Sequence, residues 1–215
     1  SPLNDGLSKQ LTFNSTISII LLERECGPMF FERYNKEVIE PFAISVIAKS
    51  FDTKYAQYIH PTDDDNFDYI SLDGLHAVEV VLVIPENEKK AYEYEVQLSK
   101  GKMRLRINRI KDAVIKEDGS LLSYYGGSLR SLIASIKEVV NKKCNKAKKR
   151  KATKSFETVD LCVCVQDGSL MDLHSYRIAG FDFSESQFDN IFFITPSYFF
   201  RYSKTTGFEE YLRIV

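Results

Sequence analysis

The sequence predicts an α/β protein with a mixed β-sheet flanked by helices. Short apolar runs suited to buried strands, a tight hairpin between Asp68 and Val80, and long segments of helical periodicity all point to this class. The 215 residues, 44% hydrophobic and 27% charged, suffice for one core or at most a small second unit. We therefore expect a single domain over residues 1–215, with its core at about 17–165 and an aromatic-rich C-terminal extension at about 186–215.

The N-terminal part predicts helix followed by strand. Residues 17–40 are mostly helical in pattern, although Gly27 and Pro28 must interrupt or restart the helix. The apolar run at 42–48 is β-prone and predicts a short strand before the acidic loop at 62–68.

The middle of the chain alternates between helix and strand signals. Pro85 followed by acidic residues predicts a helix over 85–98. Alternating apolar and basic residues predict a half-exposed strand over 102–110. Ser128 is placed to cap a long helix with an apolar stripe at spacings of three and four. The stripe consists of Leu129, Leu132, Ile133, Ile136, Val139 and Val140.

The C-terminal part predicts two more strands and a tail with two interpretations. Residues 158–165 are apolar enough for a strand buried on both faces, and 190–195 are also β-prone. The aromatic tail that follows Pro196 fits either a final hairpin or a strand with a helical turn.

Cysteine usage and hydropathy favour a cytoplasmic protein with no membrane segment. The four cysteines form no CxxC pair, and Cys162 and Cys164 share one face of their predicted strand, so buried free thiols are expected. The apolar run at 17–22 lacks a basic flank and a cleavage site, so we do not interpret it as a signal peptide. No run approaches the length of a membrane-spanning helix.

Charge is unevenly distributed although the net charge is −1. Residues 142–154 contain eight basic residues and no acid, whereas the loop at 62–68 is acidic. Such a basic strip can bind an anionic polymer, and a solvated helix face is the alternative.

The hairpin places two acids against each other. Asp73-Gly74 predicts a type I′ turn, in which Asp68 falls directly opposite Glu79 with their Cβ atoms about 5 Å apart. Glu79 lies in the apolar run VEVVLVI, where a carboxylate must be paired, protonated or bound to a metal. The hairpin contains no Lys or Arg, so the spacing predicts a site for a hard divalent cation, unless both acids face water.

These residues resemble the core motif of the PD-(D/E)XK nuclease superfamily, which has the restriction-endonuclease-like fold. An Asp, a short hairpin and then Glu-x-Lys define that motif, and FDYISLDGLHAVEVV resembles small bacterial members. The likeness covers about half of the chain, roughly residues 59–165. It implies a restriction-endonuclease-like mixed sheet and hydrolysis of DNA phosphodiesters, in a bacterial or phage setting.

The resemblance assigns roles residue by residue. Asp68 matches the motif aspartate and Glu79 the motif glutamate, and both would bind Mg²⁺ or Mn²⁺ with the Val80 carbonyl as a further ligand. The motif lysine position is Val81, which departs from the pattern and puts catalysis in doubt.

In some members the lysine comes from the following helix, and Lys142, Lys143 and Lys146 are the candidates here. Many members also use an acid from the first helix, for which Glu23, Glu25 and Glu32 are the candidates.

Contacts to DNA are expected from the basic helix at 142–154 and from Arg104, Arg106 and Arg109, directed at phosphates without reading sequence. Restriction-like nucleases often act as dimers, so a homodimer is a further expectation of the resemblance. Histidine chemistry is the weaker interpretation, because His60, His76 and His174 are scattered along the sequence.

Two alternatives to a nuclease follow from the same residues. Because of Val81, the chain could be a catalytically degenerate nuclease fold that binds nucleic acid or protein. It could also be an unrelated interaction protein whose aromatic tail packs against a partner or into its own core. The tail aromatics are Tyr198, Phe199, Phe200, Tyr202, Phe208 and Tyr211.

Overall fold

A six-stranded mixed sheet forms the centre of the protein. The computed structural model describes residues 36–62, 66–101, 107–123, 128–165, 180–195 and 198–211. The strands of the sheet follow the order β1-β2-β5-β6-β7-β8. Their bounds are Tyr69–Ile70 (β1), His76–Val83 (β2), Thr158–Val165 (β5), Asn190–Ile194 (β6), Phe199–Ser203 (β7) and Gly207–Tyr211 (β8). β5 pairs in parallel with β2 and β6, and the outer pairs are antiparallel, so the expected α/β class with a mixed sheet is confirmed.

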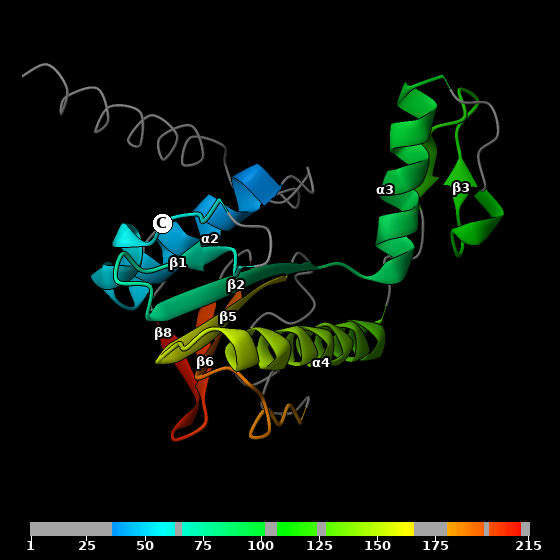
Figure 1. The fold of residues 1–215 in the computed structure, drawn as a ribbon. Coiled ribbons are helices and arrows are strands. Elements are labelled where there is room, and N and C mark those ends of the chain that lie inside the picture. The colour runs from blue at the N-terminus through cyan, green and yellow to red at the C-terminus, as the bar shows by residue number, and fades with distance from the viewer. Residues whose placement is uncertain are drawn as a thin grey trace, which may run out of the picture.

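Two helices cover opposite faces of the sheet, α2 (Lys36–Ser50) on one and α4 (Leu129–Thr153) on the other (Figure 1). α4 contributes Leu132, Ile136 and Val140 to one core cluster, and these three side chains are at most 1% exposed. The apolar residues of β5 alternate between the two clusters, which is why both faces of this strand are hydrophobic apart from Asp160.

The predicted hairpin register is confirmed, but the predicted turn type is wrong. Tyr69 pairs with Val78 and Ile70 with Ala77, as the expected register requires. Among the described residues of the turn only Gly74 has positive φ (74°), so Asp73 does not adopt the type I′ conformation. Instead the Asp73 carboxylate accepts hydrogen bonds from the Ser71 hydroxyl and the Leu75 N–H, which stabilises a longer loop of the same register.

Two predicted strands are wrong where the structure describes them. Residues 42–48 lie within α2, where Ala43, Ile44 and Ile47 pack against the sheet. Residues 107–109 of the predicted strand 102–110 form the 3₁₀ helix η2 (Ile107–Arg109), and residues 102–106 are outside the described part.

A lobe projects from the sheet between β2 and α4 (Figure 1). It contains the predicted helix, α3 (Glu86–Ser99), followed by η2 and a two-stranded sheet of β3 (Val114–Ile115) and β4 (Leu121–Ser123). Its own hydrophobic cluster is formed by Ala91, Tyr94 and Ile110 with flanking partly buried residues from the same segment. Exposed Arg109 belongs to this lobe, whereas Arg104 and Arg106 lie outside the described residues.

The tail forms a final hairpin of β7 and β8, which decides between its two interpretations. Phe199 and Phe200 are fully buried, and Tyr198, Tyr202, Phe208 and Tyr211 pack against the two core clusters. Core packing therefore explains the aromatic residues of the tail.

Cys162 and Cys164 are buried free thiols on one sheet face, as expected, and Cys144 is a half-buried free thiol. A short 3₁₀ helix, η1 (Thr53–Gln57), follows α2. None of the described helices combines the length and the apolar character that a membrane span requires.

Candidate functional site

β2 carries the two sides of the candidate site because its side chains alternate between the sheet faces. Ala77, Val81 and Val83 pack in the core beneath α4, and Glu79 points to the same face. Val78 and Val80 pack on the face covered by α2. Val81, to which the resemblance assigns the lysine position, is partly buried and packs against this core cluster.

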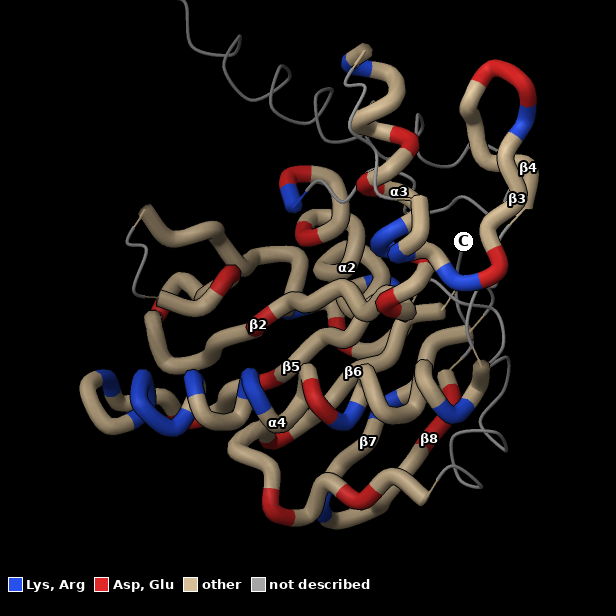
Figure 2. The backbone as a smooth tube through the Cα atoms, turned by 90° about the vertical axis from the view of Figure 1, so that its right-hand side faces the viewer, with Lys and Arg blue, Asp and Glu red and all other residues tan. Residues whose placement is uncertain are grey.

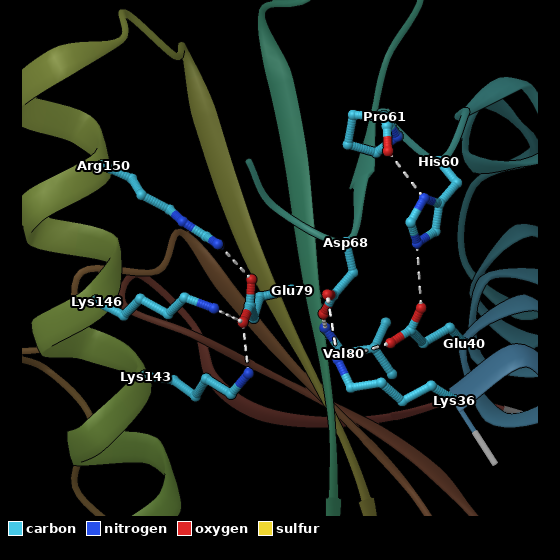
Figure 3. Close-up of polar contacts among 10 residues, drawn as sticks. All are labelled: Lys36, Glu40, His60, Pro61, Asp68, Glu79, Val80, Lys143, Lys146 and Arg150. Carbon is cyan, nitrogen blue, oxygen red and sulfur yellow. Dashed lines mark hydrogen bonds and ion pairs between the residues drawn. The ribbon is translucent and has the colours of Figure 1, made fainter. Parts of the chain in front are cut away.

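Three cations of α4 surround the Glu79 carboxylate (Figure 3). Lys143 donates to Oε1, Lys146 lies 3.5 Å from the same atom, and Arg150 donates to Oε2 at 2.8 Å. The Glu79 side chain is only 2% exposed. Its burial raises the pKa, but the three cations outweigh that effect and hold the pKa of Glu79 below its ordinary value.

Helix geometry brings these cations together. Lys143, Lys146 and Arg150 occupy positions i, i+3 and i+7, which lie on one face of a helix. Ala147 on the same side is 1% exposed, so a small side chain brings the helix close to the sheet. Of the three predicted lysines, the structure brings Lys143 and Lys146 to Glu79 and leaves Lys142 exposed.

Asp68 has different partners from Glu79. The strand pairing of β1 stops at Tyr69, and the Asp68 Oδ2 atom accepts a hydrogen bond of 2.8 Å from the Val80 N–H. Its Oδ1 atom lies 4.0 Å from the Lys36 ammonium. Figure 3 shows Glu79 reaching toward α4, while Asp68 lies beside Val80 toward Lys36. The predicted direct opposition of the two acids is thereby avoided.

A second carboxylate, that of Glu40 on α2, lies near Lys36 together with Asp68, and these two acids form the acidic side of the site. Glu40 was not among the site residues predicted from the sequence. It is 6% exposed, and its carboxylate oxygens lie 3.4 Å from the Lys36 ammonium and 3.5 Å from His60 Nε2. Burial has the largest effect on the pKa of Glu40 and raises it, and the neighbouring charge of Asp68 raises it further. Lys36 and His60 lower this pKa, but they do not cancel the increase. The available signal was the i, i+4 pair of Lys36 and Glu40.

The earlier candidates for this first-helix acid, Glu23, Glu25 and Glu32, lie outside the described residues.

Lys36 connects the two sides electrostatically. The charge of Asp68 is the largest influence on its pKa, and the charges of Asp68, Glu40 and Glu79 together raise that pKa against a smaller effect of burial. The Lys36 side chain is 78% exposed, so water screens its ion pairs with Asp68 and Glu40, and they contribute little to stability.

His60 lies beside the Glu40 carboxylate, with its Nε2 atom 3.5 Å away. Its Nδ1 atom is 3.0 Å from the Pro61 carbonyl oxygen, which can only accept, so a hydrogen bond there requires the proton on Nδ1. Nε2 can then donate to Glu40 only when the ring is protonated.

A further buried acid, Asp160 of β5, is fully paired on the α2 face of the sheet. It accepts hydrogen bonds from the Tyr55 hydroxyl at 2.7 Å and from the Asn190 side chain at 2.8 Å. This arrangement explains its burial without a ligand.

Across the described ranges, no three His, Cys, Asp or Glu side chains form a group that could hold a metal ion. Glu40 and Asp68 are two carboxylates that share one exposed lysine, and Glu79 is engaged by α4. A divalent cation would therefore draw on two acidic side chains, supplemented by backbone carbonyls, water and its ligand.

No family model, no curated protein and no solved structure matches the chain. The inference of function therefore depends on the residues of the site.

Proposed function

We propose that the protein is a metal-dependent DNA nuclease with a restriction-endonuclease-like fold. The observation that carries the proposal is the separation of charge across β2, with carboxylates for a cation on one side and ammonium and guanidinium groups on the other. Phosphodiester hydrolysis needs both a cation near the attacking water and positive groups around the phosphate.

The placement of α4 supports this proposal despite Val81. Lys143 and Lys146 of α4 bring two ammonium groups to Glu79, the residue that matches the motif glutamate. In some members of the superfamily that the sequence resembles, a lysine that is absent from the motif comes from a later helix, and α4 would have this role here. The same lysines would contact phosphate groups of the bound strand.

Glu40 and Asp68 are the residues that would hold the cation, together with the Val80 carbonyl. The N–H and C=O of one strand residue point to the same edge, and the Val80 N–H already contacts Asp68. Mg²⁺ commonly binds one or two carboxylates and keeps water and phosphate as its other ligands, so this donor set suits it. When bound, Mg²⁺ or Mn²⁺ would polarise the phosphate and lower the pKa of the attacking water.

The chain's own residues then have separate tasks. Asp68 is oriented by the Val80 N–H, and α4 holds Glu79 in a fixed position between the two sides. Lys36 places one positive charge beside the two carboxylates of Glu40 and Asp68.

A second candidate function is a degenerate nuclease fold that binds nucleic acid without cutting it. It is favoured by the full engagement of Glu79, because both of its oxygens already contact cations. The basic residues gathered along α4 would serve that function equally well (Figure 2).

A cleavage assay separates the two candidates. Supercoiled plasmid and single-stranded DNA are incubated with the protein in Mg²⁺, Mn²⁺ or EDTA, beside the isosteric variants Asp68→Asn and Glu40→Gln. We expect metal-dependent cutting that falls about 100-fold or more in both variants, because each removes a ligand charge. Glu117→Gln, at an exposed position of the lobe, is the matched control and should cut like wild type.

Absence of cutting by folded wild type with every metal would refute the nuclease and leave the binding module. Cutting that is unchanged in Asp68→Asn and Glu40→Gln would place the active site elsewhere.

A further inference from the structure

The cluster around Glu79 contains more positive charge than its buried acid neutralises. Lys143, Lys146 and Arg150 bring three cations to one carboxylate, which leaves an excess of two positive charges. The charge of Glu79 is fixed, since its pKa is held below the ordinary value. A cation excess at a partly buried position favours binding of an anion.

The cluster is fixed on its inner side and open on its outer side. The Lys143 and Arg150 side chains are 19% and 12% exposed, and Arg150 lies over the Phe67 ring at 5.0 Å. Lys146 is 50% exposed, so a ligand can reach the cluster from solution. Such a partly ordered set of donors loses less conformational entropy on binding than free surface lysines do.

Unused donors remain on these side chains. An ammonium group has three N–H donors and a guanidinium group has five, whereas each group makes one described contact with Glu79. A phosphate oxygen can therefore bind without displacing the carboxylate. On the acidic side of β2, by contrast, the single cation Lys36 lies beside two carboxylates.

We propose that Lys143, Lys146 and Arg150 bind a terminal phosphate of a nucleic-acid strand, without a metal. A terminal phosphate carries about −1.5 to −2 charge and three free oxygens near neutral pH, which matches an excess of two positive charges and three donor groups. An internal phosphodiester carries a single charge and two free oxygens, and matches them less well. The inference rests on the proposed function for its nucleic-acid ligand, and it makes the end of a strand the preferred ligand.

The exposed lysines of α4 extend this site along the strand. Lys142 and Lys149 lie seven residues apart, about 10 Å along one side of the helix, with Lys146 between them. The spacing suits phosphates that follow the terminal one, and these contacts should be sensitive to salt.

The test measures binding in EDTA, so that neither a metal nor cleavage contributes. Three single-stranded oligonucleotides of one sequence are compared, with a 5′-phosphate, a 3′-phosphate or hydroxyl groups at both ends, by fluorescence anisotropy at fixed salt. We expect one phosphorylated form to bind about tenfold more tightly than the hydroxyl form, as is typical of charge-assisted hydrogen bonds. Inorganic phosphate should compete with that form.

The variants are Lys146→Gln and Lys143→Gln, with Lys148→Gln as the matched control on an exposed position of the same helix. Lys146→Gln removes a half-exposed charge and should leave the fold intact. It should abolish the preference for the phosphorylated end, whereas Lys148→Gln should keep it.

Equal binding of all three oligonucleotides by folded wild type would overturn the inference, as would a preference that survives both Lys146→Gln and Lys143→Gln. The cleavage assay tests the nuclease activity separately from this inference. If the protein does not cut DNA but still prefers a phosphorylated end, the proposed nuclease activity is refuted and the terminal-phosphate site is retained.

Discussion

At the scale of single residues, Glu79 shows how a strongly apolar strand tolerates a buried charge. The flanking Val78 and Val80 belong to the opposite sheet face, so one charged side chain does not interrupt the core on that face. Removal of the Glu79 charge would leave Lys143, Lys146 and Arg150 facing one another without an acid.

We predict that Glu79→Gln lowers the free energy of unfolding by about 1–3 kcal/mol at pH 7, less than for a sealed ion pair because the cations can turn toward water. Since the pKa of Glu79 is lowered on folding, its contribution is present above the ordinary value of 4.5 and is lost as the pH falls through the folded value. Urea unfolding from pH 3 to 8 measures this difference. A stability difference that grows as the pH falls below 4 would contradict the assignment, and Glu117→Gln should show no comparable change.

Part of the candidate site could be predicted from the sequence, because some of its charged residues lie in local patterns. Asp68 and Glu79 follow from the hairpin register, and Lys143 and Lys146 from the basic helix. Arg150 belongs to the basic strip and Glu40 to an i, i+4 pair with Lys36, but their places in the site depend on how α4 and α2 pack on the sheet, which these local patterns do not specify.

At the scale of elements, α4 serves both packing and charge. Its N-terminal half packs Leu132 and Ile136 in the core, and Ser128 caps it by accepting from the Ser131 N–H at 3.1 Å. Its C-terminal half carries the cations around Glu79, where Ala147 sets the distance between helix and sheet.

We predict that Ala147→Leu destabilises the protein by about 1–3 kcal/mol, because extra volume in a packed contact displaces the helix. The displacement should also separate Lys143 and Lys146 from Glu79 and raise the pKa of Glu79, which carboxyl NMR titration would detect. Ala152→Leu places the same side chain on an exposed position of α4 and is the control. Equal effects of the two substitutions would contradict the packing role of Ala147.

Helices and strands were predicted correctly where the sequence showed both a clear hydrophobic period and residues that mark the ends of the element. The stripe and Ser128 defined α4, and the run of apolar residues around Asp160 defined β5. The β-branched residues at 42–48 indicated a strand, but their burial against the sheet outweighs that propensity and α2 is helical. Propensity alone could not predict this outcome, because it depends on which neighbour covers the segment.

At the scale of the whole molecule, the described residues form three hydrophobic clusters. Two lie on opposite faces of the sheet, and the third lies in the lobe, which is described over residues 86–101 and 107–123. The lobe is small, and the hydroxyl of Tyr94 in its cluster donates to the Gly119 carbonyl at 2.7 Å.

We predict that the lobe opens at a lower free energy than the sheet does, because a small cluster stabilises it. Native-state hydrogen exchange against denaturant should show α3 amides exchanging by a separate opening, while the amides of β5 exchange only on global unfolding. A single isotherm shared by α3 and β5 would contradict this division.

The contacts of Glu79 also determine when the site can form during synthesis of the chain. Its partners on α4 lie 64, 67 and 71 residues further along the sequence. A ribosome therefore completes β2 and the whole lobe before the first of these cations exists, and until then the strand has an acid with no partner on that face. Assembly of the basic side has to wait for α4, so a truncated or incompletely synthesised chain lacks the anion site even when its hairpin is formed.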